Sequence, residues 1–393
     1  MNQSPATSRQ NYELDTYDQV PDYVVNWDQP WEAFLSKGTG LTMLSNFYTV
    51  RVDIKAVDQI FHTVEQAYQY AIAYLFDEDV AMDAVGKPNL NATEVKEIAR
   101  VHKNRFLNAT SRATLWHMLP HVMRPLLLQK FADPRASQQL EASGNAQLLE
   151  ANRGDAFWGV AMAAHELFEH RLRQPVKNVM GQLLEQVRHF RRTNECRWPK
   201  TIIIGDVGIF PLIASGGSPH KTVLSWPGST FTELAQLAIL VAYPPIERII
   251  FVGGQQSAIT TLKSGEVTTL NSTNYTKLII RKLSYIRHFI PPQVELMLVP
   301  PSPYWDLFHS PKFDWAGELD YKLPTRIAKM AHLQPTRVMV MPPKLRTMDA
   351  WEWQPNTEGP VFTITPMNEP KLTAVGLAEM DNWLDSISQP NST

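Results

Sequence analysis

The chain has 393 residues, 44% of them hydrophobic and 19% charged, and its formal net charge is −2. This composition is that of an ordinary globular protein of two or three domains, without an overall basic field for nucleic acid. The single cysteine, Cys196, excludes an internal disulfide and a cysteine-based zinc cluster. The first twenty residues are polar, and no apolar stretch is long enough to span a bilayer. We therefore expect a cytoplasmic or nuclear protein without a membrane partner.

The beginning of the chain combines a polar segment with a strand and a helix. Residues 1–35 are polar with scattered aromatics, which predicts an extension partly packed on the first domain. Residues 50–54 alternate between apolar and polar side chains, which predicts a strand. Thr63 and Gln66 form a capping-box pattern, and the apolar residues that follow from Val64 repeat at three-and-four spacing. A helix should therefore begin here.

The rest of the first half is expected to be mainly helical. Apolar periodicity predicts helices at residues 94–105, 115–131 and 178–188, and a short helix, a turn at Gly144 and a strand at 148–150 within residues 137–151. Pro120 and Pro125 should break the second of these helices. A loop with aromatic residues follows the predicted strand.

Glu65 lies in the first turn of the helix that begins near Thr63. Free backbone N–H groups and the positive end of the helix favour an ionised carboxylate there. With Tyr68 and Gln69 nearby in the sequence, such a carboxylate could face a developing positive charge. The simpler alternative is that Glu65 only stabilises the helix.

The order of motifs over residues 41–190 resembles the NADAR family, which includes the YbiA-like N-glycosidases. The matching elements are Leu44-Ser45-Asn46-Phe47-Tyr48, Thr63-Val64-Glu65-Gln66-Ala67-Tyr68-Gln69, Lys96, Leu115-Trp116, Met123, Lys130-Phe131, Leu148-Leu149-Glu150-Ala151, Asp155-x-x-Trp158-Gly159 and Asn178-x-x-Gly181-x-Leu183-Leu184. An ordered set of this length is far more specific than any one short motif.

The resemblance implies hydrolysis of bonds between ribose C1 and a nitrogen base, without a cofactor or a metal. Members of the family act on ribosylamino intermediates of riboflavin synthesis, and some act on ADP-ribose attached to nucleic-acid bases. Bond cleavage places positive charge on the sugar, which a carboxylate can stabilise, and a second acid can assist departure of the base. By resemblance, Glu65 is the main catalytic carboxylate and Asp155 assists it. The substrate-binding residues that the resemblance implies are Asn46, Phe47, Gln69, Lys96, Trp116, Glu150, Trp158, Gly159, Asn178 and Gly181.

Several of these residues also have structural interpretations. Trp116 and Trp158 are expected to form a wall for the ligand's rings, but either could be a core aromatic. Asn178 could cap its helix instead of binding ligand, because Asn is a favoured N-cap residue. Asp155 could stabilise an Asx turn in its loop.

The sequence also departs from the family pattern. Ile72 stands where members usually carry a lysine, and Ala161 and Ala99 stand where they usually carry glycines. The alanines add bulk where close approach of the backbone to the ligand would matter. Ile72, together with Val207 in the second half, favours an alternative in which the protein binds ADP-ribose or a nucleotide without cleaving it. His165 and Glu169 are one helical turn apart, but without an evident third ligand a solvated helix is favoured over a metal site.

The second half alternates between strands and helices. Buried strands are predicted at residues 201–204, 221–225, 248–252 and 295–299, with helices at 229–241 and 275–289. Such a pattern is typical of a parallel sheet covered on both faces, a three-layer α/β domain. We therefore expect two domains, an N-terminal α+β domain that is mainly α, and a C-terminal α/β domain.

The ends of these predicted strands resemble SGNH (GDSL-type) hydrolases. The first ends at Gly205-Asp206-Val207, with valine in place of the nucleophilic serine. Asp306 and His309 have the Asp-x-x-His spacing of that family's last motif. An active esterase would need Ser225 or Ser229 instead. The glycine-rich segment 215–222 resembles a phosphate-binding loop but has His220 before the lysine, so that interpretation is set aside.

The sequence thus predicts an N-glycosidase joined to an SGNH-like domain without its nucleophile. The expected boundaries are an extension at 1–35, the NADAR (YbiA-like) domain at 36–192, a linker at 193–200, the SGNH-like domain at 201–388 and a tail at 389–393. The expected ligand is a small ribosyl-base or ADP-ribosyl compound, or ADP-ribosylated nucleic acid. The protein partner of the second domain is not indicated.

Overall fold

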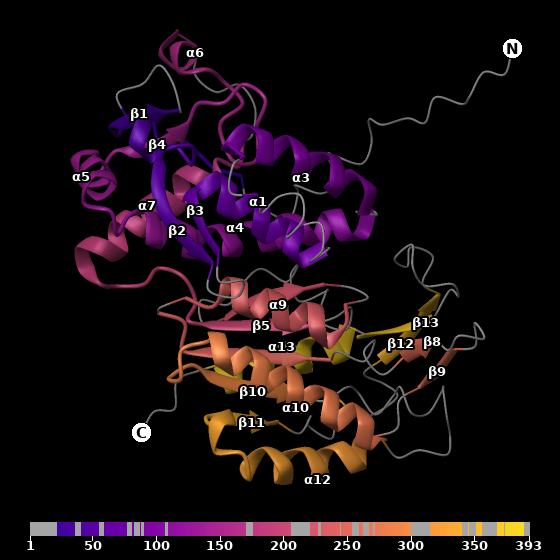
Figure 1. Cartoon of the computed structure of the whole chain (residues 1–393). Helices are drawn as coiled ribbons and strands as arrows, with labels where there is room; N and C mark the ends of the chain where they lie inside the picture. The colour runs from indigo at the N-terminus through magenta and orange to yellow at the C-terminus, as the bar shows by residue number, and fades with distance from the viewer. Residues whose placement is uncertain are drawn as a thin grey trace, which may run out of the picture.

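The computed structural model divides into a mainly helical N-terminal part and an α/β C-terminal part that are packed together (Figure 1). The structure describes residues 22–35, 41–54, 59–76, 81, 87, 90–106, 109–169, 176–205, 221–226, 229–243, 245–253, 259–261, 267–269, 272–299, 315–339, 345, 351–355, 368–372 and 374–388. Among the helices in these ranges, none is both long enough and apolar enough to cross a membrane.

The first part contains two small sheets and a group of helices, as the α+β prediction required. Strand β1 (Trp31–Phe34) pairs in parallel with β4 (Gln147–Glu150), and β2 (Thr49–Ile54) pairs antiparallel with β3 (Gln59–Thr63). The helices are η1 (Thr42–Leu44), α1 (Val64–Phe76), α3 (Ala92–Phe106), α4 (Ala109–Lys130), α5 (Pro134–Ala142), α6 (Ala164–Glu169) and α7 (Val179–Thr193).

Helix α1 begins where the capping pattern predicted. The Thr63 hydroxyl accepts a hydrogen bond from the backbone N–H of Gln66 at 3.1 Å, and the Gln66 side chain accepts one from the N–H of His62 at 3.2 Å. These bonds satisfy donors that the first helical turn leaves free. The helix then buries Tyr70 and Tyr74 in the core of the first part.

The predicted break in the next long helix is wrong. Helix α4 continues from Ala109 to Lys130 through both Pro120 and Pro125. Each proline removes a backbone hydrogen bond and disfavours an isolated helix. Val122 and Leu126 are buried between and after the prolines, and this burial in the shared core stabilises the helical path, as tertiary packing generally does for helices.

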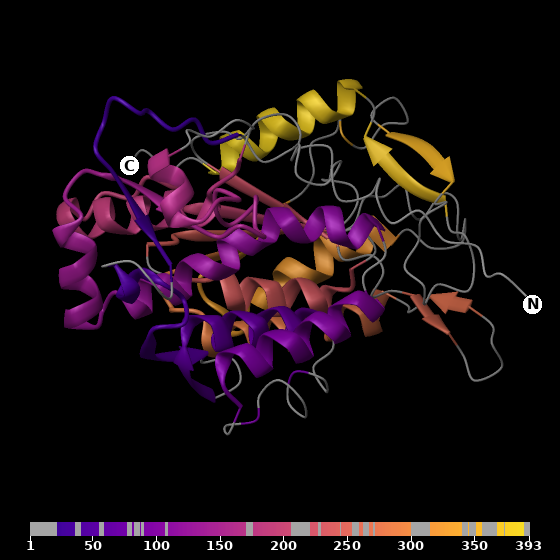
Figure 2. The same cartoon turned by 90° about the horizontal axis from the view of Figure 1, so that it is seen from above.

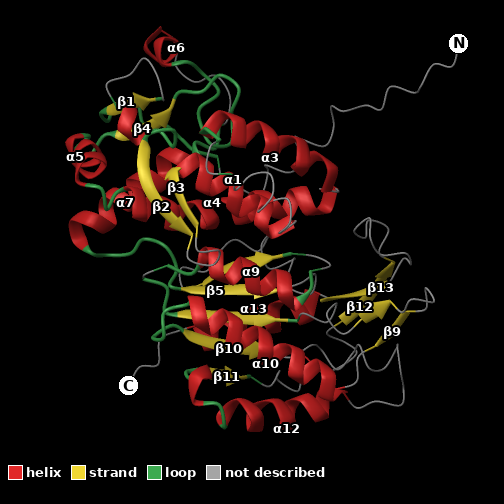
Figure 3. Ribbon diagram, viewed as in Figure 1, coloured by secondary structure: helices red, strands yellow, loops and turns green. Residues whose placement is uncertain are grey.

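The second part is built on a parallel sheet of five strands (Figure 3). Its order is β11–β10–β7–β5–β6, with bounds β5 (Thr201–Gly205), β6 (Lys221–Ser225), β7 (Arg248–Val252), β10 (Glu295–Val299) and β11 (Thr336–Val338). Numbered along the chain, this is the order 2-1-3-4-5 of flavodoxin-like folds. Strands β5, β6, β7 and β10 were predicted from the sequence, and β11 was not.

Alternate residues of each strand face opposite sides of this sheet. Ile202 and Ile204 join the core that includes α9 (Phe231–Val241) and α10 (Ser272–Phe289). Ile203 joins a separate core with Met380 of α13 (Ala374–Ser388). Helices therefore cover both faces, which confirms the α/β prediction. The remaining helices of this part are α12 (Trp315–Ala328) and η6 (Ala331–Leu333). Two antiparallel pairs, β8 (Ile259–Thr261) with β9 (Val267–Thr269) and β12 (Trp351–Pro355) with β13 (Asn368–Leu372), lie at one end of the molecule (Figure 2).

Helix α9 lies between the two parts, and the hydrophobic core is continuous across it. The guanidinium of Arg124 in α4 donates to the Tyr243 hydroxyl just after α9 at 3.1 Å. Trp198, in the predicted linker, is only 4% exposed, and its ring lies 5.6 Å from that of Phe190 and 6.0 Å from that of Tyr243. The two parts therefore share an interior.

Helix α13 is fixed to the sheet by a buried cation. The Nζ atom of Lys221 lies 2.7 Å from carboxylate oxygens of both Asp381 and Asp385, and the lysine side chain is only 2% exposed. By contrast, the ion pair between Lys200 and Glu247 has both side chains about half exposed.

Replacing Lys221 with methionine should lower the free energy of unfolding by about 2–3 kcal/mol, because it leaves two carboxylates without their buried partner. The matched change Lys200→Met breaks an exposed pair and should cost less than about 1 kcal/mol. Urea unfolding of both variants measures the difference. Equal effects would show that burial of the Lys221 pair is unimportant for stability.

Candidate functional site

Glu65 and its neighbours form the centre of the candidate site. Glu65 is 5% exposed, and one of its oxygens accepts a hydrogen bond from the Gln69 amide at 2.9 Å and lies 3.5 Å from Lys96 Nζ. Its backbone N–H donates to the Asn46 carbonyl at 3.0 Å. Lys96 is half exposed, so the pair connects a buried carboxylate to the surface. Gln69 of the same helix, Lys96 of α3 and Asn46 of the turn after η1 therefore all contact Glu65.

Aromatic side chains lie beside this carboxylate. The Trp158 ring packs edge-on against Tyr68 of α1, with centroids 5.6 Å apart. Trp116 instead packs on the buried Phe157 at 4.6 Å. Lys96 Nζ lies 5.8 Å from the ring of Phe47, which is 37% exposed. Trp116 and Trp158 thus belong to one group of rings that packs on the core, while Phe47 contacts Lys96. The ligand-wall and core interpretations of the two tryptophans both have support.

Glu150 ends strand β4 and differs from Glu65 in its partners. Its Oε2 atom is buried and has no hydrogen-bond partner within the described part of the chain. Burial, together with the nearby charges of Asp155 and Glu65, raises the pKa of Glu150 to about 8. The surroundings of Glu150 therefore favour the neutral form of its carboxyl group.

Lys130 belongs to the same neighbourhood, although the sequence assigned it no role. It is fully buried, and its Nζ donates to the carbonyl oxygens of Leu44 and Ser45, each at 2.7 Å. Burial lowers the pKa of Lys130 to about 7, a shift that the ionised form of Glu150 would oppose. The lysine therefore holds the turn that leads to Asn46. Its place in the Lys130-Phe131 motif was the only sequence signal.

Asn46 presents a second acceptor without a partner. Its amide nitrogen contacts the sulfur atoms of Met123 and Met180 at 3.7 and 3.9 Å, and its Oδ1 atom is buried without a hydrogen bond among the described residues. Unpaired buried oxygens are costly unless a ligand or water satisfies them. Asn46 and Glu150 are the positions where a polar ligand would recover that cost.

Asp155 adopts the turn geometry that was the alternative for it. Its Oδ1 atom accepts hydrogen bonds from the backbone N–H groups of Phe157 at 3.1 Å and Trp158 at 2.7 Å. This is the Asx-turn pattern. The carboxylate therefore orients the loop that carries Trp158.

Asn178 supports strand β4. Its side chain is fully buried, donates to the Leu148 carbonyl at 2.9 Å and accepts from the Glu150 N–H at 3.2 Å. It makes no cap hydrogen bond to α7, so the capping alternative is wrong.

The predicted glycines are needed for close packing around the same strand. A Cβ atom on Gly181 would lie 1.9 Å from the Leu148 carbonyl oxygen, and one on Gly159 would lie 2.5 Å from that of Glu150. Both distances are too short for any other residue type without movement of the backbone. These glycines therefore hold α7 and the 151–163 loop against β4.

Gly181→Ala should lower the free energy of unfolding by about 3 kcal/mol or more, because the added methyl group overlaps backbone. Gly154→Ala is the matched control: its Cβ would meet nothing nearer than 3.9 Å, and it should change stability by less than about 0.5 kcal/mol. Thermal unfolding followed by circular dichroism distinguishes them. Unchanged stability of the Gly181→Ala variant would contradict the packing role of Gly181.

The departures from the family pattern have clear positions. Ile72 is 3% exposed and lies in the hydrophobic core. Ala161 has φ = 54°, a left-handed conformation that favours glycine.

The residues considered for a metal site make other contacts. The Arg153 guanidinium pairs with Glu166 at 2.6 Å and contacts His165 at 3.3 Å. Within the described ranges, no group of three His, Cys, Asp or Glu residues could hold a metal ion.

Much of the predicted SGNH-like site lies outside the described residues. Val207, Asp306 and His309 are in this category, as is the 215–220 part of the segment that resembled a phosphate-binding loop. Ser225 and Ser229, the alternative nucleophiles, are 0% and 1% exposed, so neither hydroxyl is open to solvent.

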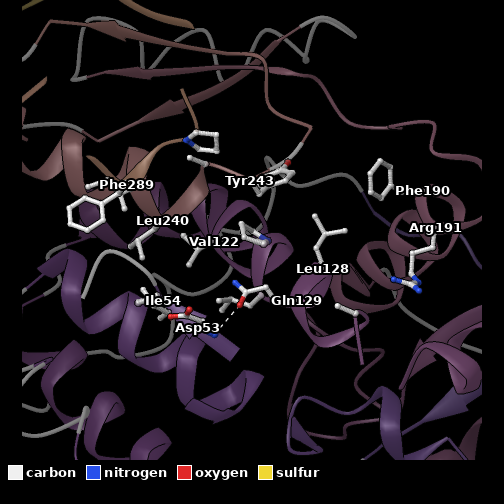
Figure 4. Close-up of a pocket in the computed structure, with 17 residues that line it drawn as sticks. Asp53, Ile54, Val122, Leu128, Gln129, Phe190, Arg191, Leu240, Tyr243 and Phe289 are labelled. Atoms are coloured by element: carbon white, nitrogen blue, oxygen red, sulfur yellow. Dashed lines mark hydrogen bonds between the residues drawn. The ribbon is translucent and has the colours of Figure 1, made fainter. Parts of the chain in front are cut away.

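A cavity of about 520 Å³ lies between the two parts and away from the candidate site (Figure 4). Its lining comes from both halves and includes Asp53, Val122, Gln129, Arg191, Leu240, Tyr243 and Phe289. None of the predicted site residues lines it. The cavity is a feature of the junction between the two parts.

The fold and the site define a two-part α/β protein whose helical part holds buried carboxyl groups beside aromatic rings. Residues 33–190 match the family model of the NADAR domain, so a NADAR domain lies within the first part. This family is linked to ADP-ribose-related N-glycosidase activity. The match gives no support to the SGNH-like resemblance of the second part. A search of curated proteins finds no match to the chain.

Proposed function

We propose that the NADAR domain hydrolyses the N-glycosidic bond between a nitrogen base and the ribose of a ribose phosphate or ADP-ribose. The observation that carries the proposal is the buried Glu65 carboxylate, fixed by Gln69 and Lys96 beside Tyr68 and Trp158. Positive charge develops on the ribose as the bond to the base weakens. A preorganised carboxylate in a site of low dielectric stabilises that charge strongly.

The other residues of the site would hold the ligand. Asn46 offers an unpaired buried oxygen to a ribose hydroxyl or an exocyclic amino group. Trp158 and Phe47 offer aromatic surface to a base. Lys96 is exposed enough to reach a phosphate while keeping its contact with Glu65. A small ribosyl compound and an ADP-ribosylated nucleic acid both carry these groups, and both remain candidate ligands.

The second candidate is a domain that binds ADP-ribose or a nucleotide without cleaving it. One observation favours it: Ile72, in place of the family's usual lysine, is buried in the apolar core and supplies no charge. The remaining polar residues around Glu65 would still bind a ligand in that case.

For the second part, the proposal is a non-catalytic module that binds a partner or positions a substrate. The 2-1-3-4-5 strand order is compatible with an SGNH-like fold, and valine at position 207 removes the nucleophile of that family. The burial of Ser225 and Ser229 argues against either serine as a replacement nucleophile.

Glu65→Gln should reduce the release of free base about 100-fold or more, because the variant keeps the shape of the side chain but loses its charge. Candidate substrates are ADP-ribosylated guanosine and ribosylamino pyrimidine phosphates, with the released base measured by chromatography. The matched control is Glu195→Gln, whose side chain is 78% exposed and makes none of the contacts described for the site. It should retain full activity.

If the wild-type protein binds these compounds but releases no base, the non-catalytic candidate replaces the hydrolase. If Glu65→Gln is as active as wild type, the assignment of Glu65 is wrong.

A further inference from the structure

We infer that Glu150 is the catalytic residue that donates a proton to the departing base. The inference rests on the proposed hydrolysis and assigns to Glu150 the acid role that the sequence assigned to Asp155. Three carboxyl groups lie in the site, and their surroundings differ enough to separate their roles.

The backbone fixes the position of Glu150 from both sides. Its N–H donates to Asn178 Oδ1 at 3.2 Å, and its carbonyl accepts from the N–H of Val160 at 2.9 Å. Gly159 passes directly over that carbonyl, where a larger residue does not fit. The side chain thus begins from a rigid strand end, as the positioning of a catalytic group requires.

The hydrogen bonds separate Glu150 from the other two carboxyl groups. Glu65 accepts from Gln69 and pairs with Lys96, and Asp155 accepts two backbone N–H groups. Donors of this kind favour the charged form of a carboxyl group. The buried Oε2 of Glu150 has no donor among the described residues, so its neutral form is favoured instead.

The charges that face Glu150 come from four elements. Glu65 of α1 and Asp155 of the 151–163 loop disfavour its ionisation, while Lys96 of α3 and Lys130 of α4 favour it. Burial outweighs the two lysines and raises the pKa of Glu150 to about 8. One carboxyl group that stabilises the charge on the sugar and a second that protonates the base are the pairing that acid-assisted glycoside cleavage uses.

The reaction step balances without another reactant besides water. The electron pair of the C1–N bond leaves with the base nitrogen, which takes the carboxyl proton of Glu150. Glu65 stabilises the positive charge on the sugar while water attacks C1. The proton that this water loses returns to the Glu150 carboxylate, which restores the enzyme.

A substrate that needs no proton on its leaving group tests the role directly. ADP-ribose joined at C1 to 4-nitrophenol releases a stable phenolate, whereas ADP-ribosylated guanosine must release a basic nitrogen. Glu150→Gln should lower base release about 100-fold, since general acid catalysis contributes about 10²–10⁴, and change nitrophenol release less than about threefold. Glu65→Gln should lower both. Wild-type base release should fall as the pH rises past about 8, the pKa of Glu150.

A titration of the Glu150 carboxyl group measures its protonation without relying on enzymatic activity. In protein labelled with ¹³C at the glutamate carboxyl carbons, the signal missing from the Glu150→Gln spectrum should titrate near pH 8. Titration near the ordinary glutamate range overturns the inference. Equal loss of both activities in Glu150→Gln also overturns it, while the activity of the wild type still supports the proposed function. If the wild type releases neither product, the proposed function fails and the proton-donor role falls with it, whatever the titration shows.

Discussion

The close approach of helix α7 to strand β4 is the constraint on which the candidate site depends. Gly181 leaves no space for a side chain against the Leu148 carbonyl, and Asn178 satisfies the strand's backbone on the same side. A buried backbone group without such a partner would destabilise the fold. The packing therefore fixes the end of β4, and with it Glu150. The family resemblance suggests Asn178 and Gly181 as ligand contacts, but in this structure they support the strand that carries Glu150.

The site shows how one residue type serves different purposes in different surroundings. Glu65 is paired with a cation and an amide, Asp155 shapes a turn, and the buried Oε2 atom of Glu150 has no donor in the part of the chain that the structure describes. Hydrogen bonds fix the positions of Glu65 and Asp155, whereas burial is the largest cause of the raised pKa of Glu150. Carboxyl groups with different partners thus lie in one neighbourhood of the domain.

Local patterns predicted local structure well, and the misses arise from contacts between distant segments. The start of α1 depends only on neighbours such as Thr63 and Gln66, which the sequence displays. Pro120 and Pro125 are helix breakers by local rules, but burial of the surrounding helix outweighs them. The state of Glu150 depends on α1, α3, α4 and a loop together, and no pattern within its own segment records that environment.

The shared interior of the two parts has a consequence for synthesis of the protein. The ribosome makes the NADAR domain before helix α9, so during that interval Val122 and Leu126 of α4 lack the apolar residues of α9 that line the same cavity in the folded protein. Exposed apolar surface on a nascent chain favours aggregation and chaperone binding. The hydrophobic core of the first part thus includes residues near 240, well beyond the end of its family match at 190.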